Sequence, residues 1–245
     1  MTATISAATP SVRKSSHFAV TPTSTRSQCV EAILDLIVRR EIPRETRTSE
    51  ADILTALFGE EDPRPRTPVR EALAVLAWQG FLHQVPQSGT YIHDVAAAEV
   101  RDLCDSRTEI ECLVVRKLVA TPEIDISRVA SFADALGGAL EPLDVDAFLV
   151  SDTDFHTRLA TLAGYTPAAG TIRQWGDKLR VFASSPNIRR DDAAREAIGK
   201  QFRVICDQHD HLLQDLSTGD VDAACVTIGA HFRTLSELAS ITAAS

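Results

Sequence analysis

The spacing of hydrophobic side chains predicts two parts of different character along the chain. In the first part, apolar residues at helical spacing and then two short alternating runs predict three helices and two strands, over residues 28–40, 49–58, 68–79, 81–85 and 90–93. Ser49 or Thr48 is expected to cap the second helix, and Gly59 to end it. Residues 86–89, between the two strands, have the composition of a hairpin turn.

The second part has apolar positions at a period near 3.6 throughout and no convincing strand. The pattern predicts helices over residues 96–120, 125–139, 144–164, 168–184, 190–217 and 221–241. Proline and glycine residues separate these helices, so an antiparallel helical bundle is expected. The fold class is therefore mainly α, with a winged helix-turn-helix over residues 26–95 and an all-helical domain over 96–245. Residues 1–25 are rich in Ser, Thr, Ala and Pro and are expected to form a disordered tail.

Composition excludes several classes of protein. The chain has 245 residues, 44% hydrophobic and 24% charged, which is typical of a globular protein. No apolar run is long enough to predict a transmembrane helix, and the first residues lack the apolar stretch of a secretory signal. The five cysteines are irregularly spaced and form no CxxC pair, which favours a reduced, cytoplasmic protein over a disulfide framework or a zinc ribbon.

The net charge of −9 argues against non-specific nucleic-acid binding by the chain as a whole. The charge is unevenly distributed, however. Residues 1–95 contain 10 Lys/Arg and 11 Asp/Glu, a net charge of −1, whereas residues 96–245 contain 15 and 23, a net charge of −8. The acidity therefore belongs mostly to the helical domain and does not exclude DNA binding by the first part.

Arginines gather at the start of the third predicted helix, at positions 64, 66 and 70. Thr67 is expected to be the N-cap and Pro68 the first helical residue. In a winged helix-turn-helix this helix end enters the major groove, where arginine can contact guanine and the first-turn N–H groups can meet a phosphate. By themselves, Arg64, Arg66 and Arg70 are equally consistent with a solvated helix face.

The sequence RTPVREAL, residues 66–73, resembles the recognition-helix signature of GntR-type bacterial transcription regulators. Matching segments flank it in the order of that family, at residues 49–54, 80–82 and 89–92. The resemblance implies that Arg66 and Arg70 contact DNA, that Glu71 orients an arginine, and that Gly89 forms the tip of the wing.

Two departures from the family pattern affect DNA contacts. Residues 59–65 replace a shorter Gly-x-Ser connection and add an acidic stretch together with Arg64. Ser88 stands where the family usually has a basic residue before the wing glycine. The operator sequence and the wing contacts are therefore not fixed by the resemblance.

Four residues of the helical part form a candidate metal site. Asp152 and His156 are four apart on one predicted helix, so they project from the same face. His209 and His231 lie about 12 Å and about 16 Å from the turn that joins the last two helices, so an antiparallel hairpin brings them to similar heights. One carboxylate and three imidazoles can bind zinc, nickel, manganese or iron. The alternative is a set of unrelated histidines. Two neighbours at other helical angles are expected to face away, Asp154 and His211.

The segment DTDFHTRL, residues 152–159, resembles the Asp-x-x-Phe-His element of the FCD domain, the helical domain of the FadR branch of GntR regulators. The resemblance implies that Asp152, His156, His209 and His231 bind a divalent metal, with zinc in first place. It also implies a small carboxylate or related metabolite as effector.

Two further residues are implied to bind the effector. Arg107 occupies the family's Arg-x-x-Leu-Glu position, and its guanidinium is expected to pair with the acid group of the ligand. The alternative is a surface ion pair between Arg107 and Glu111. Residues 163–165, Ala-Gly-Tyr, stand where the family often has Ser-Gly-Asn, so the polar contact usual there is either lost or supplied by Tyr165.

These features together predict a ligand-responsive transcription regulator, a repressor, that binds operator DNA as a cytoplasmic homodimer without contacting a membrane. One alternative is a helical metalloenzyme, a hydrolase or oxygenase, that activates water at the Asp/His site. Against it, the sequence contains no HExxH, GxSxG or P-loop motif, and no general base is apparent. The other alternative is a regulator whose metal is purely structural.

Overall fold

The computed structural model describes the chain from Thr25 to residue 243, with short gaps. Residues outside the description are 1–24, 43, 45–46, 61–65, 86–88, 122, 185–190 and 244–245. The predicted tail, apart from Thr25, and the positions Arg64 and Ser88 therefore lie outside the described residues.

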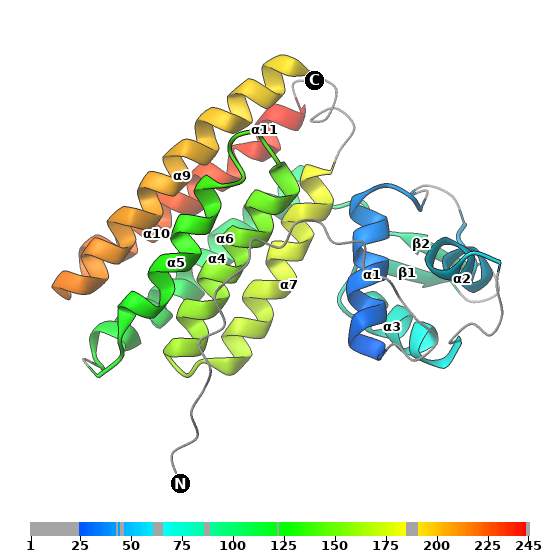
Figure 1. The fold of residues 1–245 in the computed structure, drawn as a ribbon, viewed down its shortest axis with the longest axis horizontal. Coiled ribbons are helices and arrows are strands. Elements are labelled where there is room, and N and C mark those ends of the chain that lie inside the picture. Colours follow the sequence, from blue (N-terminus) through cyan, green and yellow to red (C-terminus); the bar gives the residue numbers. More distant parts are fainter. Residues whose placement is uncertain are drawn as a thin grey trace, which may run out of the picture. The chain divides into compact units, whose positions relative to one another are not determined.

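The described residues form two compact units. One comprises Cys104–Arg173 and Glu196–Leu235, and the other comprises the described residues of 25–103, 174–195 and 236–243. Helices dominate both, and the two strands of the described part form a small hairpin (Figure 1). The predicted fold class, a winged helix-turn-helix followed by an all-helical bundle, is confirmed.

The winged helix-turn-helix contains three helices and two strands. They are α1 (Arg26–Val38), α2 (Glu50–Phe58), α3 (Arg66–Trp78), β1 (Leu82–Val85) and β2 (Gly89–Ile92). Helix α1 packs against α3, and the antiparallel strands pair with Leu82 opposite Ile92. Thr25 and Ser49 begin α1 and α2 with capping boxes, and Gly59 ends α2 at a φ of 69°, as the sequence predicts for α2.

Helix α3 begins earlier than predicted. Its first residue is Arg66, so Thr67 lies in the first turn and is not the N-cap. The physical reason is that the first four N–H groups of a helix have no intrahelical partner, so the missing N–H of Pro68 is tolerated at the third position as well as the first.

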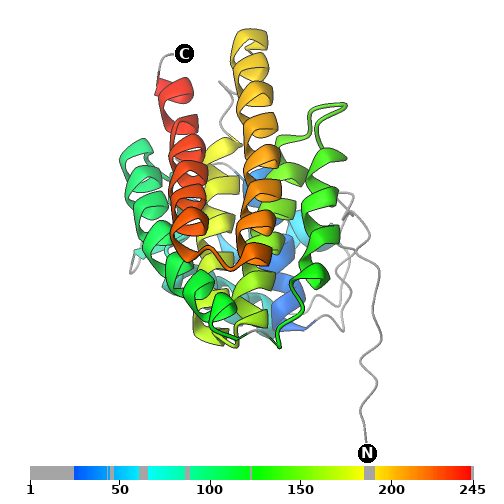
Figure 2. The same ribbon diagram turned by 90° about the vertical axis from the view of Figure 1, so that its left-hand side faces the viewer.

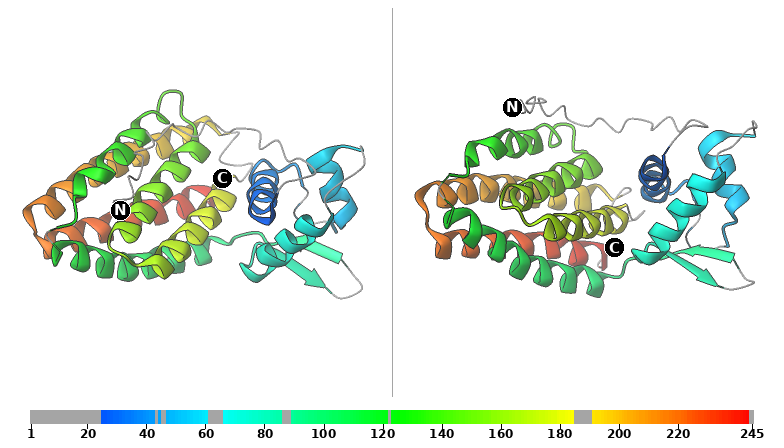
Figure 3. Two further views of the ribbon diagram at one scale, coloured as in Figure 1. Left: turned by 60° about the horizontal axis from the view of Figure 1, so that its bottom comes forward. Right: turned by 90° about the horizontal axis from the view of Figure 1, so that it is seen from below.

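The helical bundle follows the predicted order closely. Its elements are α4 (Ala97–Val119), the 3-10 turn η1 (Ile126–Val129), α5 (Ala130–Gly137), α6 (Val145–Leu162), α7 (Thr166–Ala183), α9 (Asp192–Thr218), α10 (Val221–Ser236) and α11 (Leu238–Ala243). Two predicted helices are interrupted: the one over 125–139 starts with η1, and the one over 221–241 breaks at Glu237. Helices α9 and α10 run antiparallel and side by side, joined by a turn at Gly219 with a φ of 77° (Figures 2 and 3).

Most of the buried side chains in the described part of the bundle are apolar. Phe148 stacks on Phe202, with ring centroids 3.8 Å apart. On α4, α6, α9 and α10 lies a group of ionisable side chains, none more than 2% exposed: Arg107, Glu111, Asp152, His156, His209 and His231. Burying so many ionisable groups is costly unless they are paired or bind a ligand, so this group marks a functional site. No described helix is long and apolar enough to cross a membrane.

Candidate functional site

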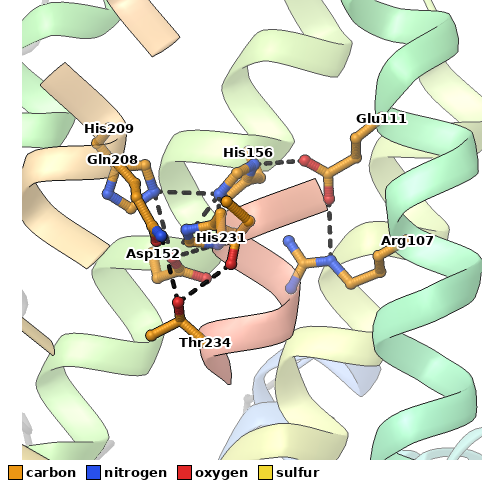
Figure 4. A network of polar contacts seen from close by, with 9 residues as sticks. Arg107, Glu111, Asp152, His156, Gln208, His209, His231 and Thr234 are labelled. Atoms are coloured by element: carbon orange, nitrogen blue, oxygen red, sulfur yellow. Dashed lines mark hydrogen bonds and ion pairs between the residues drawn. The ribbon is translucent and has the colours of Figure 1, made fainter. Parts of the chain in front are cut away.

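Three helices bring the four predicted metal ligands together. Asp152 and His156 are one turn apart on α6, His209 lies on α9 and His231 on α10 (Figure 4). Asp220 accepts a hydrogen bond from the N–H of Ala223 at 2.9 Å and so caps α10 after the Gly219 turn. This tight connection holds α9 and α10 so that the rings of His209 and His231 lie 4.8 Å apart.

The ligand atoms converge on one point. Nε2 of His156 is 3.1 Å from Nε2 of His209 and 3.1 Å from Nε2 of His231. Oδ1 of Asp152 is 3.3 Å from Nε2 of both His209 and His231 and 3.7 Å from that of His156. All four atoms lie within 4.8 Å of one another, which is the spacing of donors around a single ion.

The donor set fits a divalent metal. Neither oxygen of Asp152 has a hydrogen-bond partner among the described residues, although the carboxylate is fully buried. Three imidazole nitrogens around this carboxylate cannot all satisfy it and one another through hydrogen bonds, because a neutral imidazole has only one N–H. A cation at the centre would satisfy all four atoms together. Such a set, with three nitrogens and one oxygen, suits zinc, nickel, manganese or iron.

The protonation states favour metal binding as well. Burial, only partly opposed by Asp152, holds the pKa of His209 below its usual value and that of His231 well below it, so both imidazoles are neutral at pH 7. Burial by itself would raise the pKa of Asp152. The surrounding histidines outweigh burial and lower this pKa, so the carboxylate is ionised. Neutral imidazoles and an ionised carboxylate are the forms that bind metals.

Arg107 of α4 extends into the same buried cluster. Its Nε donates to Oε1 of Glu111 at 2.9 Å, and its guanidinium lies 4.4 Å from the ring centroid of Phe232. The Arg107–Glu111 pair anticipated from sequence therefore exists, but its predicted surface position is wrong, since both side chains are buried. The reason is that this face of α4 packs inward, which a spacing of four residues does not reveal.

The outer edge of the Arg107 guanidinium is free. Nη1 and Nη2 are buried and have no hydrogen-bond partner among the described residues. Figure 4 shows the guanidinium directed from α4 toward His231. Two parallel N–H donors without a partner form the geometry that binds a carboxylate in a bidentate manner.

Glu111 was not singled out as a site residue from the sequence, apart from its pairing with Arg107. Its Oε2 contacts Nδ1 of His156, so it lies between the arginine and the metal ligands. Burial would raise the pKa of Glu111, but His156 and Arg107 outweigh burial and lower it. The signal in the sequence was its position one turn after Arg107, on the same helix face.

The other candidates of the helical part lie away from this cluster. Asp154 is partly exposed and pairs with Arg173 at 2.7 Å, and His211 is exposed. Tyr165 lies between α6 and α7, 37% exposed, with Nζ of Lys117 at 4.3 Å from its ring centroid. A contact between Tyr165 and an effector stays a prediction.

The second candidate site is the exposed N-terminal end of α3. Arg66, Thr67 and Arg70 are all exposed there. The Nε of Arg70 is 2.6 Å from Oε2 of Glu50 on α2, so Glu50 is the acid paired with this arginine. The sequence did not reveal this partner because it lies on another helix, 20 residues away. The role of Glu71 in orienting an arginine stays a prediction.

Gly89 begins β2 with a φ of 123°, a conformation that residues with a Cβ rarely adopt. A Cβ there would lie 2.7 Å from the side chain of Arg47. The arginine therefore lies directly over the wing strand and is exposed. Arg47 supplies a positive charge next to the wing, and sequence reasoning missed it.

Comparison with known proteins identifies the family of the helical part of the chain. Residues 102–234, more than half of the chain, match the family model of the FCD domain. The chain therefore belongs to the family of FCD-domain proteins, and its predicted place among GntR regulators of the FadR branch is confirmed.

Individual relatives show the same relationship. Over 110 residues the chain is 34% identical to the HTH-type transcriptional repressor RspR of Escherichia coli. The match covers 44% of this chain and 47% of RspR, so the chain spans about half the length of that relative. It is 29% identical over 171 residues to an HTH-type transcriptional regulator in an unstable DNA locus of Streptomyces ambofaciens. This match covers 69% of the present chain and 67% of that regulator. A structure described as a putative GntR transcriptional regulator of Rhodococcus sp. RHA1 has the same fold, with a TM-score of 0.63 and 22% identity. The match covers 90% of the present chain and 98% of the Rhodococcus chain.

Proposed function

We propose that this protein is a ligand-responsive transcription regulator, acting as a repressor. Its winged helix-turn-helix, with a boundary near residue 95, binds double-stranded operator DNA. Its helical domain binds a divalent metal and a small carboxylate effector. The observation that carries the proposal is the buried cluster of Asp152, His156, His209 and His231 beside the unpaired edge of Arg107, in a chain that also exposes arginines at the end of α3.

The charge of the cluster supports an anionic effector. Arg107 contributes one positive charge, and Glu111 and Asp152 contribute one negative charge each. An imidazole binds a metal in its neutral form, so the cluster with a bound divalent ion has a net charge of +1. A buried net charge is unfavourable, so the metal-bound cluster favours the binding of a monoanion. A carboxylate bound to Arg107 would neutralise the charge of the cluster.

The DNA contacts would come from Arg66, Thr67 and Arg70 of α3, with Gly89 at the wing and Arg64, which precedes α3 in the sequence. Palindromic operators need two recognition helices about one turn of DNA apart, so we propose a homodimer in the cytoplasm. Effector binding would change the affinity for DNA by favouring one spacing of the two DNA-binding domains.

DNA binding is tested by fluorescence anisotropy with the promoter region of the protein's own gene at low and moderate salt. Nanomolar binding that exceeds binding to unrelated DNA supports the proposal. Equal, weak binding to both DNAs at all salt concentrations would refute it.

Effector binding is tested by thermal unfolding with a panel of organic and sugar acids, with and without a chelator. Stabilisation by a carboxylate that disappears with the chelator supports a metal-dependent effector site. Zinc stabilisation without any carboxylate effect would instead favour the alternative of a structural metal. The enzyme alternative is not favoured, because the relatives are named as regulators and each oxygen of Glu111 already faces Arg107 or His156.

A further inference from the structure

The carboxylate of Glu111 contacts both Arg107 and the predicted metal ligand His156. Glu111 is 2% exposed, and its two oxygens have different partners. Oε1 accepts from Nε of Arg107 at 2.9 Å, whereas Oε2 contacts Nδ1 of His156 (Figure 4). Both oxygens of one side chain are thus engaged, one toward the effector arginine and one toward a metal ligand.

The contact with His156 determines which nitrogen can bind a metal. A carboxylate accepts hydrogen bonds, so the Nδ1 beside Glu111 carries the proton and Nε2 keeps its lone pair. That Nε2 is the atom which faces His209 and His231. Among the described residues, the other ion-pair contacts of these imidazoles run from Nε2 of each ring to Asp152, so the Nδ1 contact with Glu111 distinguishes His156 from His209 and His231.

The contact with Arg107 determines which edge of the guanidinium is free. Nε is occupied by Glu111, and Phe232 covers one face of the guanidinium at 4.4 Å. The remaining donors, Nη1 and Nη2, have no described partner. Glu111 and Phe232 therefore hold the guanidinium so that its Nη edge is available to an anion.

We propose that Glu111 is a positioning residue shared by the metal site and the effector site, a role that rests on the proposed function of both. It fixes the Nδ1–H tautomer of His156, and it turns the Nη edge of Arg107 toward the ligand. Carboxylates that hold metal-binding histidines in this way typically contribute 10- to 100-fold to metal affinity.

The test uses the full-length metal-free protein and compares Glu111→Gln with Glu109→Gln. Glu109 is an exposed residue of the same helix, so its substitution controls for the loss of a negative charge on α4. The glutamine amide retains the shape of the side chain, but it accepts hydrogen bonds at one oxygen only, whereas the carboxylate accepts them at both oxygens. Titration with Co(II), followed by its visible absorption, gives the affinity and reports the ligand geometry. We expect Glu111→Gln to bind Co(II) about 10- to 100-fold more weakly with an altered spectrum, and Glu109→Gln to match the wild type.

A second measurement needs no substitution, so it remains decisive if Glu111→Gln does not fold. Long-range 1H–15N spectra of the histidine-labelled wild-type protein with zinc report the tautomer of each imidazole. We expect His156 to be protonated at Nδ1, with a proton that exchanges slowly with water. The Nε2–H tautomer would overturn the role of Glu111.

The outcomes separate this inference from the proposed function. A wild-type protein that binds no Co(II) at millimolar concentration refutes the metal site, and the role of Glu111 with it. If the wild type binds Co(II) and Glu111→Gln binds it equally well with the same spectrum, the metal site stands and the role of Glu111 is wrong.

Discussion

Arg70 of α3 and Glu50 of α2 form an ion pair, with 2.6 Å between Nε and Oε2. The arginine side chain is 66% exposed, and the glutamate holds it from one side only. An exposed pair of this kind contributes little to stability, typically below about 1 kcal/mol. Its effect is to hold the Arg70 side chain at the exposed N-terminal end of α3, where we propose that DNA binds.

Replacing Arg70 should weaken operator binding without unfolding the protein. We expect Arg70→Ala to lose about 1–3 kcal/mol of specific binding, because one guanidinium contact to a base edge contributes that much. Fluorescence anisotropy with operator and unrelated DNA measures the loss. Arg128→Ala, an exposed arginine of η1, is the matched control and should bind as the wild type does. Equal losses in both variants would mean that only overall charge matters.

The metal content of the purified protein tests the Asp/His cluster. We expect elemental analysis to find about one divalent ion per chain, since one set of four ligands is present. The double substitution of His156 and His209 by Ala should remove the ion, and His211→Ala, an exposed histidine, should retain it. An unchanged metal content in the double variant would contradict the site.

Removing Arg107 should destabilise the bundle, because the negative charge of the buried Glu111 then loses the guanidinium with which it is paired. We expect Arg107→Ala to lower the free energy of unfolding by about 3–5 kcal/mol, as for other buried pairs that lose one partner. Urea unfolding monitored by circular dichroism measures this change. Arg101→Ala on the exposed part of α4 should change it by no more than about 0.5 kcal/mol. A small effect at Arg107 would show that the pair is not buried in solution.

Two glycines should respond to alanine in opposite directions. Gly89→Ala places a Cβ at a φ of 123° and against Arg47, so we expect a loss of stability above about 1 kcal/mol. Gly170 lies in α7, where a Cβ would meet nothing within 4 Å, so Gly170→Ala should stabilise the protein by about 0.5–1 kcal/mol. Thermal unfolding of the two variants provides the comparison, and a shift of the same sign in both would refute it.

The buried thiol of Cys104 should be unreactive in the native protein. Burial raises its pKa to about 12, so almost no thiolate is present at pH 8. We expect iodoacetamide at pH 8 to label Cys104 only after unfolding in urea, as measured by mass spectrometry of peptides. Rapid labelling of the folded protein would contradict its burial.

Much of this architecture could be predicted from local sequence. The spacing of apolar residues located the helices, and the interval from Asp152 to His156 placed two ligands on one face. The turn at Gly219 aligned His209 with His231. These features depend on helix geometry alone.

What the sequence did not reveal depends on packing between elements. The burial of Arg107 and the role of Glu111 follow from the inward orientation of one face of α4, which a polar helix segment does not indicate. Glu50 pairs with Arg70 across two helices. The break at Glu237 carries no proline or glycine to mark it.

The ligand residues come from three helices that lie far apart along the chain, which has a consequence for folding. The separation between His156 and His231 is 75 residues, and α7 and α9 lie between them. An ion bound to both would act as a cross-link that closes a long loop, and such closure limits the conformational entropy of the unfolded chain. The supply of metal in the cell would then set how much of the regulator survives proteolysis, independently of any effector.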